Sequence, residues 1–365
     1  MISNTHSLLL LLIAMFVLTG CGASSSSSST TTNTELEVAA SNIIDNVIIP
    51  AANNFQTKAQ KLDDDAHSFC SAMANLTDAS LIGLQETWLA TASAWYTLLP
   101  YKFGPMETSV IVPHYLYIDS YRNDHTDRST NVTNSISAIV ADTDEITDDY
   151  FTNATPSSVG LLPIEIIFNV YTDVNNYSTP NDRLCSLLKA YTTQLSYRAN
   201  IIADGWSVNY RNSGESYRTL LLSKKLDIVL DDEDGSSAIS KIVVGIQDYF
   251  DYLTRRNVTT DQAKISDTIW RHLLASINSV NAVLNEDNNS HVSILALMVN
   301  NGYEQEANTV KSNMALILST ININSTSSTD PTNMKNAAAL LDGNFKREIA
   351  DGLGVNAGLN FSDGD

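Results

Sequence analysis

The segment Gly160-Leu161-Leu162-Pro163-Ile164-Glu165-Ile166-Ile167-Phe168 places one carboxylate inside an apolar run. Pro163 lacks an N–H and has a fixed φ, which suits the first position of a helix, so we expect a helix to begin there. Glu165 then lies in the first turn and caps backbone N–H groups. Alternatively, the flanking isoleucines bury the carboxylate, which then needs a cation or hydrogen-bond donors. The second interpretation makes Glu165 a candidate ligand-binding residue.

The histidines are the other candidates for metal chemistry. Beyond the first twenty residues they are His67, His114, His125, His272 and His291. None has an acidic residue or a second histidine three or four positions later, so the zinc-protease pattern His-Glu-x-x-His is absent. We therefore expect surface or hydrogen-bonded core histidines rather than ligands.

His114 is the best placed of the five, because it lies between a Gly104-Pro105 turn and Asp119. A metal held by Glu165, Asp119 and His114 requires the fold to bring these three residues together. The metal would be iron or another divalent cation.

Other catalytic and metal-binding patterns are excluded. The run Asp231-Asp232-Glu233-Asp234-Gly235 is no EF-hand, because Leu230 and Lys241 stand where that loop needs oxygen ligands. The sequence also lacks Gly-x-Ser-x-Gly and a phosphate-binding glycine loop. Covalent hydrolase chemistry therefore has no support in the sequence.

Gly160 and Glu165 resemble the Gly-x-His-x-x-Glu signature of the imelysin-like lipoproteins, with Leu162 in the place of the histidine. Other segments are similar to the same family: Val47-Ile48-Ile49-Pro50, Trp88, Ala94-Trp95, Phe103-Gly104-Pro105, Ile118 to Arg122, and the closing Gly358 to Asp365. The resemblance covers most of the chain and is weakest in its second half.

The resemblance implies an iron-regulated protein of the cell surface or periplasm, in a family that also carries a metallopeptidase label. Our first hypothesis is a non-enzymatic, membrane-anchored binding protein linked to the uptake of iron or another ligand, with iron-uptake components as partners. Its cleft would be formed by Gly160, Glu165, Asp119 and Arg122, with Trp88 and Trp95 in support.

Two alternatives remain open. A metal-dependent peptidase is disfavoured by Leu162, because a catalytic zinc typically needs three protein ligands. A structural or adhesive lipoprotein whose site has decayed is also compatible with the missing histidine.

Helical periodicity dominates the elements that must position these residues. Amphipathic patterns predict helices over residues 35–73 (with a kink at Pro50), 81–99, 131–142, 145–151, 182–206, 215–230, 236–253, 261–284, 290–299, 304–321 and 332–353. We expect an all-α fold of two antiparallel bundles, residues 35–176 and 177–365, joined near the polar loop at 172–181.

The N-terminus has the features of an exported lipoprotein. Residues 8–18 form an apolar run of signal-peptide length, and Leu18-Thr19-Gly20-Cys21 looks like a lipobox. This predicts cleavage after residue 20, lipid on Cys21 and a Ser/Thr-rich tether over residues 21–34. Gly22 favours the outer membrane, facing the periplasm or the cell surface.

The remaining cysteines, Cys70 and Cys185, predict a disulfide in an exported protein, the alternative being two buried thiols. The formal charge of -20 excludes nucleic acid as a partner, because phosphates require lysine and arginine. The same charge permits cation binding without proving it.

Overall fold

The computed structural model describes residues 26–72, 75–107, 112–119, 128–178, 182–226, 237–285 and 293–355, with side chains from residue 34 onward. These residues form helices and turns without a strand, which confirms the predicted all-α class. Within them, no helix combines the length and the apolar character needed to cross a membrane. The signal segment, Cys21, Arg122, His125, His291, the acidic run at 231–235 and the C-terminal motif lie outside the described residues.

The first bundle contains α2 (Ile49–Ser71), α3 (Asp78–Leu98), α4 (Ser129–Ala141), α5 (Leu161–Val170) and α6 (Arg183–Ser207). Helix α2 packs between α3 and α6, and α5 contacts α3, α4 and α6. The boundary expected after residue 176 would put α6 in the second bundle. Its packing along α2 instead assigns α6 to the first bundle, because the loop that precedes α6 turns the chain back onto the same core.

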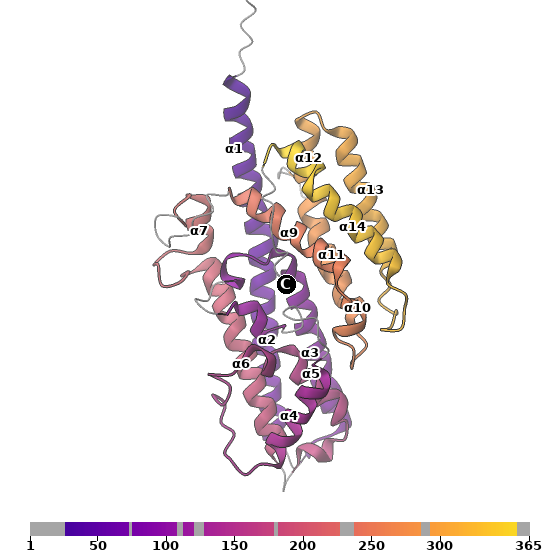
Figure 1. The fold of residues 1–365 in the computed structure, drawn as a ribbon. Helices are drawn as coiled ribbons and strands as arrows, with labels where there is room; N and C mark the ends of the chain where they lie inside the picture. The colour runs from indigo at the N-terminus through magenta and orange to yellow at the C-terminus, as the bar shows by residue number, and fades with distance from the viewer. Residues whose placement is uncertain are drawn as a thin grey trace, which may run out of the picture.

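The second bundle follows a short α7 (Tyr217–Leu222). Its helices are α9 (Ala238–Arg255), α10 (Val258–Asp261), α11 (Ile269–Asn285), α12 (Ile294–Asn300), α13 (Glu304–Thr320), α14 (Thr332–Lys346) and α15 (Glu348–Leu353). Figure 1 shows this bundle beside the upper part of the first, with α11 facing α3. The predicted helix over 145–151 is wrong, because that stretch forms turns.

Helix α1 (Ser26–Ile43) starts earlier than the sequence indicates, inside the tract predicted to be a tether. Once the C-terminal half of α1 is packed, each further helical residue adds a hydrogen bond without a new nucleation cost. A π-helical turn, Ile44–Ile48, then joins α1 to α2, and Ile49 N–H donates to the Ile44 carbonyl. The turn falls just before Pro50, where the missing N–H interrupts the α-helical pattern.

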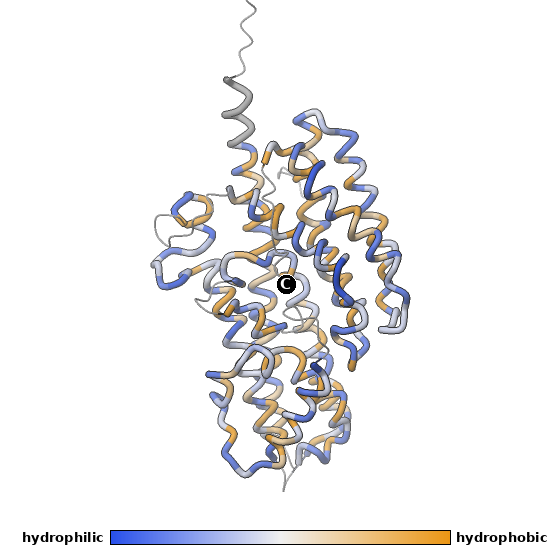
Figure 2. The backbone as a smooth tube through the Cα atoms, in the orientation of Figure 1, coloured by the Kyte–Doolittle hydropathy of each residue, from blue (hydrophilic) through white to orange (hydrophobic). Residues whose placement is uncertain are grey.

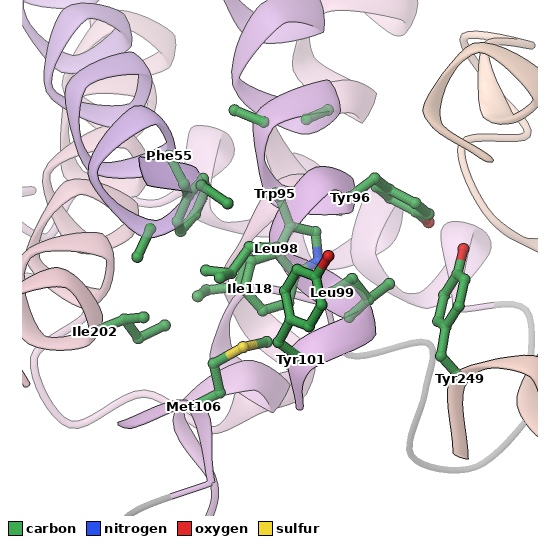
Figure 3. Packing of buried hydrophobic residues seen from close by; sticks show 14 of the residues in the cluster. Phe55, Trp95, Tyr96, Leu98, Leu99, Tyr101, Met106, Ile118, Ile202 and Tyr249 are labelled. Carbon is green, nitrogen blue, oxygen red and sulfur yellow. The ribbon is translucent and has the colours of Figure 1, made fainter. Parts of the chain in front are cut away.

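One continuous apolar core runs through both bundles. Figure 2 shows hydrophobic and hydrophilic residues alternating along the helices, as amphipathic packing requires. In Figure 3, Phe55 of α2, Trp95 and Leu98 of α3 and Tyr249 of α9 lie around the same region of the core. The two bundles are therefore packed against each other through buried side chains.

A disulfide joins Cys70 near the end of α2 to Cys185 near the start of α6, with the Cα atoms 5.4 Å apart. This confirms the predicted pairing. Hydrogen bonds from Gln56 to Asn200 and from Thr192 to Asp63 continue the same antiparallel register along the two helices. The disulfide thus fixes one end of the central helix pair.

Removing this disulfide is expected to lower the free energy of unfolding by about 4 to 5 kcal/mol, because the bond closes a long loop and restricts the unfolded chain. The sequence separation of the two cysteines is 115 residues. Equilibrium unfolding in guanidinium of the oxidised chain and of the Cys70→Ala, Cys185→Ala double variant measures the difference. A difference below about 1 kcal/mol would show that the unfolded state gains little freedom when the bond is absent.

Candidate functional site

A small pocket lies at the seam where the two bundles meet. The first bundle contributes Trp88, Ala92, Tyr96, Ile118, Asp119, Leu161, Leu162 and Glu165, and the second contributes Gln262, Ala263 and His272. The space open to the centre of a water-sized sphere is about 20 Å³, which accommodates a water molecule or a single ion. The pocket is too small in this conformation for a peptide.

Glu165 lies in the second turn of α5, because the helix begins at Leu161 rather than at Pro163. Pro163 is tolerated there, since the first four N–H groups of a helix have no partner within it. Only 2% of Glu165 is exposed, and its Oε1 accepts hydrogen bonds from the N–H and the Oγ–H of Ser266, both at 2.8 Å. The capping interpretation of Glu165 is therefore wrong, and the buried-carboxylate interpretation is confirmed.

Gly160 brings the Asp119 loop against the start of α5. Its φ of +98° and ψ of −152° belong to a region that is essentially restricted to glycine. A Cβ at this position would lie 2.7 Å from the Tyr117 carbonyl oxygen and closer still to the backbone of Ile118. The next residue, Leu161, donates its N–H to the Ile118 carbonyl at 2.9 Å. Gly160 is thus a positioning residue that places Asp119 at the pocket.

The two carboxylates shape the electrostatics of the pocket. Burial raises the pKa of the Glu165 carboxyl above its usual value, the Ser266 donors lower it, and the Asp119 carboxylate raises it again. Burial also raises the pKa of the Tyr96 hydroxyl, and Asp119 adds to that shift. Among the described lining residues there is no lysine or arginine. The pocket therefore favours a cation or a proton.

His272 forms the far wall of the pocket and is fully buried. Its Nε2 lies 3.1 Å from Thr268 Oγ1 and its Nδ1 lies 3.0 Å from Ser93 Oγ. Thr268 Oγ1 is 2.8 Å from Ser266 Oγ, so a chain of hydrogen bonds runs from Glu165 to α3. Burial lowers the pKa of His272 to about 3, and Arg271 adds to the shift. His272 is thus a neutral, hydrogen-bonded core histidine, as expected.

The loop between α10 and α11 supplies the donors to Glu165, in a stretch where the sequence pattern predicts one continuous helix over 261–284. Ala263 and Asp267 have positive φ values of 42° and 56° within this loop. Such strain in residues other than glycine is held by surrounding structure and is often found at functional sites. The polar run Ser266-Asp267-Thr268 ahead of an apolar stretch is a helix-start signal that would have indicated the break.

The predicted site residues divide into two groups. Glu165, Asp119 and Trp88 line the pocket, and Gly160 supports it. Trp95 does not line it, because its ring packs in the core 5.2 Å from the ring of Phe55. His114, the other predicted metal ligand, does not line this pocket, and its Nδ1 accepts a hydrogen bond from Arg198 at 3.1 Å.

A tightly held resident metal does not fit these residues. Leu162 lines the pocket without a donor atom, and both nitrogens of His272 already have hydroxyl partners. Within the described part of the chain, no three His, Cys, Asp or Glu residues are arranged as metal ligands. The described residues therefore do not form a catalytic zinc site with three protein ligands and an open position.

Comparisons with known proteins agree with the fold. The chain superimposes on an imelysin-like protein from Psychrobacter arcticum 273-4 with a TM-score of 0.67 and 15% identity, covering 90% of this chain and 98% of that one. It also superimposes on an iron-regulated protein A precursor from Parabacteroides distasonis ATCC 8503 with a TM-score of 0.60 and 12% identity, covering 88% and 95%. No curated protein sequence matches significantly.

The structural likeness shows the fold alone, whereas a match to a protein-family model identifies the family. The family model described as imelysin, peptidase family M75, matches residues 48–340, which include the first bundle, most of the second and every described residue of the pocket. The chain therefore belongs to the imelysin family.

Proposed function

We propose that this chain is a non-enzymatic binding protein of iron uptake, exported and held at the outer membrane by lipid on Cys21. The observation that carries the proposal is that Glu165 and Asp119, both buried, share one small pocket without a lysine or arginine in its described lining. The name of the Parabacteroides protein, an iron-regulated precursor, supports the link to iron and to export.

The proposed cargo is a ferrous or ferric ion that contacts the two carboxylates. An ion with two protein ligands is held less firmly than one in a site of three or four protein ligands. Weak retention suits a cargo that must be passed on to uptake components. It does not suit peptide hydrolysis, for which a zinc ion must stay bound through every turnover.

Calorimetric titration of the full mature chain, made without lipid as Cys21→Ser, tests this proposal. We expect one saturable site for ferrous or ferric ions, and at least about tenfold weaker binding in Glu165→Gln, because loss of even a supporting group commonly costs that much. Glu86→Gln is the matched control, since it removes the same charge from an exposed position on α3.

Three results would contradict the proposal. Absence of saturable binding by iron, zinc or calcium would remove the direct ion-binding function and favour a structural or adhesive role. Equal binding by Glu165→Gln and the parent chain would place the ion elsewhere. Proteolysis that requires added metal would favour the peptidase alternative.

A further inference from the structure

The guanidinium of Arg198 on α6 is half-buried and is held, in the described part of the chain, by neutral groups rather than by a carboxylate. Many described cations lie within 4.0 Å of a carboxylate: Lys61, Lys102, Lys189, Arg218, Lys224, Lys225, Arg255 and Lys346. Arg198 has no carboxylate partner among the described residues, although the sequence contains 41 acidic residues. Its charge is therefore not neutralised within the described structure.

Neutral groups hold Arg198 in one orientation. Nη1 donates to His114 Nδ1 at 3.1 Å. The side-chain oxygen of Gln194, in the orientation that satisfies both amide atoms, accepts from Nε at 3.1 Å and from Nη2 at 3.2 Å. Because the guanidinium of arginine has only donor groups, His114 Nδ1 must act as the acceptor, and the imidazole is neutral. Burial lowers the pKa of His114 to about 4, and the positive charge of Arg198 adds to the shift. A neutral His114 is consistent with this lowered pKa.

Two tyrosine rings flank the guanidinium. Its central carbon lies 3.9 Å from the ring centre of Tyr117 and 5.5 Å from that of Tyr197. Tyr197 is 54% exposed, so the cluster is open to solvent on that side. The three hydrogen bonds leave one N–H on Nη1 and one on Nη2, and a guanidinium uses such pairs to bind the two oxygens of a carboxylate.

We propose that Arg198, Tyr197 and Tyr117 form a binding site for the carboxylate of an organic anion. A planar carboxylate matches the paired N–H groups, and the exposed Tyr197 ring offers apolar contact to the body of the ligand. A hydrated inorganic anion gains nothing from that ring. The cluster lies outside the interbundle pocket and does not depend on cation binding by Glu165.

Partial burial of an uncompensated charge supports this assignment. Desolvation lowers the pKa of the Arg198 guanidinium, which means that the fold bears a cost for placing the charge there. The neighbouring Gln194 is buried on the same helix, one turn earlier, so the supporting acceptor is fixed by packing. A ligand carboxylate would offset that cost on binding.

Calorimetric titration of the full mature chain with metal-free citrate, and separately with inorganic phosphate, tests the site. We expect saturable citrate binding at low ionic strength. The affinity should be at least about tenfold weaker in Arg198→Gln, because paired hydrogen bonds from a charged guanidinium to a carboxylate are stronger than hydrogen bonds between neutral groups. Arg198→Lys is expected to bind as weakly, since an ammonium cannot form the fork. Arg218→Gln, which removes an arginine paired with Asp45, is the matched control and should retain affinity.

Tyr197→Ala provides a second variant that keeps the fold, because the side chain is exposed. It should weaken citrate binding about threefold through loss of ring contact. Absence of citrate binding, phosphate binding as tight as that of citrate, or full affinity in folded Arg198→Gln would overturn the proposal. Glu165→Gln should leave citrate binding unchanged, which separates this test from that of the proposed function.

Discussion

Replacing Gly160 with alanine is expected to lower the free energy of unfolding by about 3 to 5 kcal/mol, the sum of a strained backbone and an overpacked contact. The strain arises because φ is +98° at this residue. The overpacking arises because the new Cβ would meet the carbonyl oxygens of Tyr117 and Ile118, which are backbone atoms and cannot rotate away. Equilibrium unfolding in urea at neutral pH measures the loss.

Two other glycines separate these contributions. Gly214 has φ of +82° with no atom within 4 Å of a built Cβ, so Gly214→Ala should show strain alone, of about 1 to 3 kcal/mol. Gly83 lies within α3 with no atom within 4 Å of a built Cβ, so Gly83→Ala should instead raise the free energy of unfolding by about 0.5 to 1 kcal/mol. If Gly160→Ala lowered the free energy of unfolding no more than Gly214→Ala does, the close contact between residue 160 and the loop that carries Asp119 would be contradicted.

Acid is expected to destabilise the protein through His272. Its pKa is lowered from 6.5 to about 3, so the neutral form stabilises the folded state. That contribution is fully present above pH 6.5 and is lost as the pH falls toward 3. The loss is about 1.4 kcal/mol per pH unit, or about 4 to 5 kcal/mol over the whole interval. Unfolding in guanidinium at pH 7.0, 5.5 and 4.5 measures the slope.

His272→Gln is the informative variant, because an amide can replace both hydrogen bonds and does not titrate in this range. Its stability should fall less steeply with acid than that of the parent chain. The pKa of His114 is also lowered, to about 4, so His114 makes the protein less stable in acid as well. His114→Gln shows how much of the slope of unfolding free energy against pH comes from His114 rather than from His272. Parallel curves for His272→Gln and the parent chain would mean that His272 does not become charged on unfolding.

Glu165 works in the opposite sense, because its pKa is raised. Its contribution to stability is present below its usual pKa of 4.5 and is lost as the pH rises through the folded-state value. In Glu165→Gln this term disappears, so the variant should be relatively more stable at neutral pH than in acid. His272 and Glu165 therefore change the stability of the protein in opposite directions as the pH falls.

Much of the fold follows from local patterns in the sequence. The predicted helices over 304–321 and 182–206 match α13 and α6 closely, because amphipathic spacing reports which face is buried. Thr77 and Ser80 form a reciprocal cap at the start of α3, a local pattern of the kind that sequence can indicate. The bundle boundary was misplaced, because helical periodicity does not indicate which neighbouring helix covers the buried face.

The site was only half predictable for the same reason. Glu165 and Asp119 come from segments with visible turn and motif signals, whereas Ser266 and His272 reach the pocket through the packing of α11 on α3. The isolated histidine carries no ligand spacing, and its role depends on contacts with Thr268 and Ser93. Long-range contacts of this kind are absent from the local sequence pattern.

The hydrogen-bond chain across the seam has a mechanical consequence. Ser93 belongs to α3, whereas Thr268 and His272 move with α11, and Ser266 holds the carboxylate of α5. Sliding the second bundle along the first would therefore break the hydrogen bond between His272 and Ser93 and, at the same time, those from Ser266 to Glu165. Glu165 would then lose its hydrogen-bond donors. A partner that binds only α13 and α14 and shifts the second bundle would thus change the affinity of the pocket for its ligand without contacting the pocket.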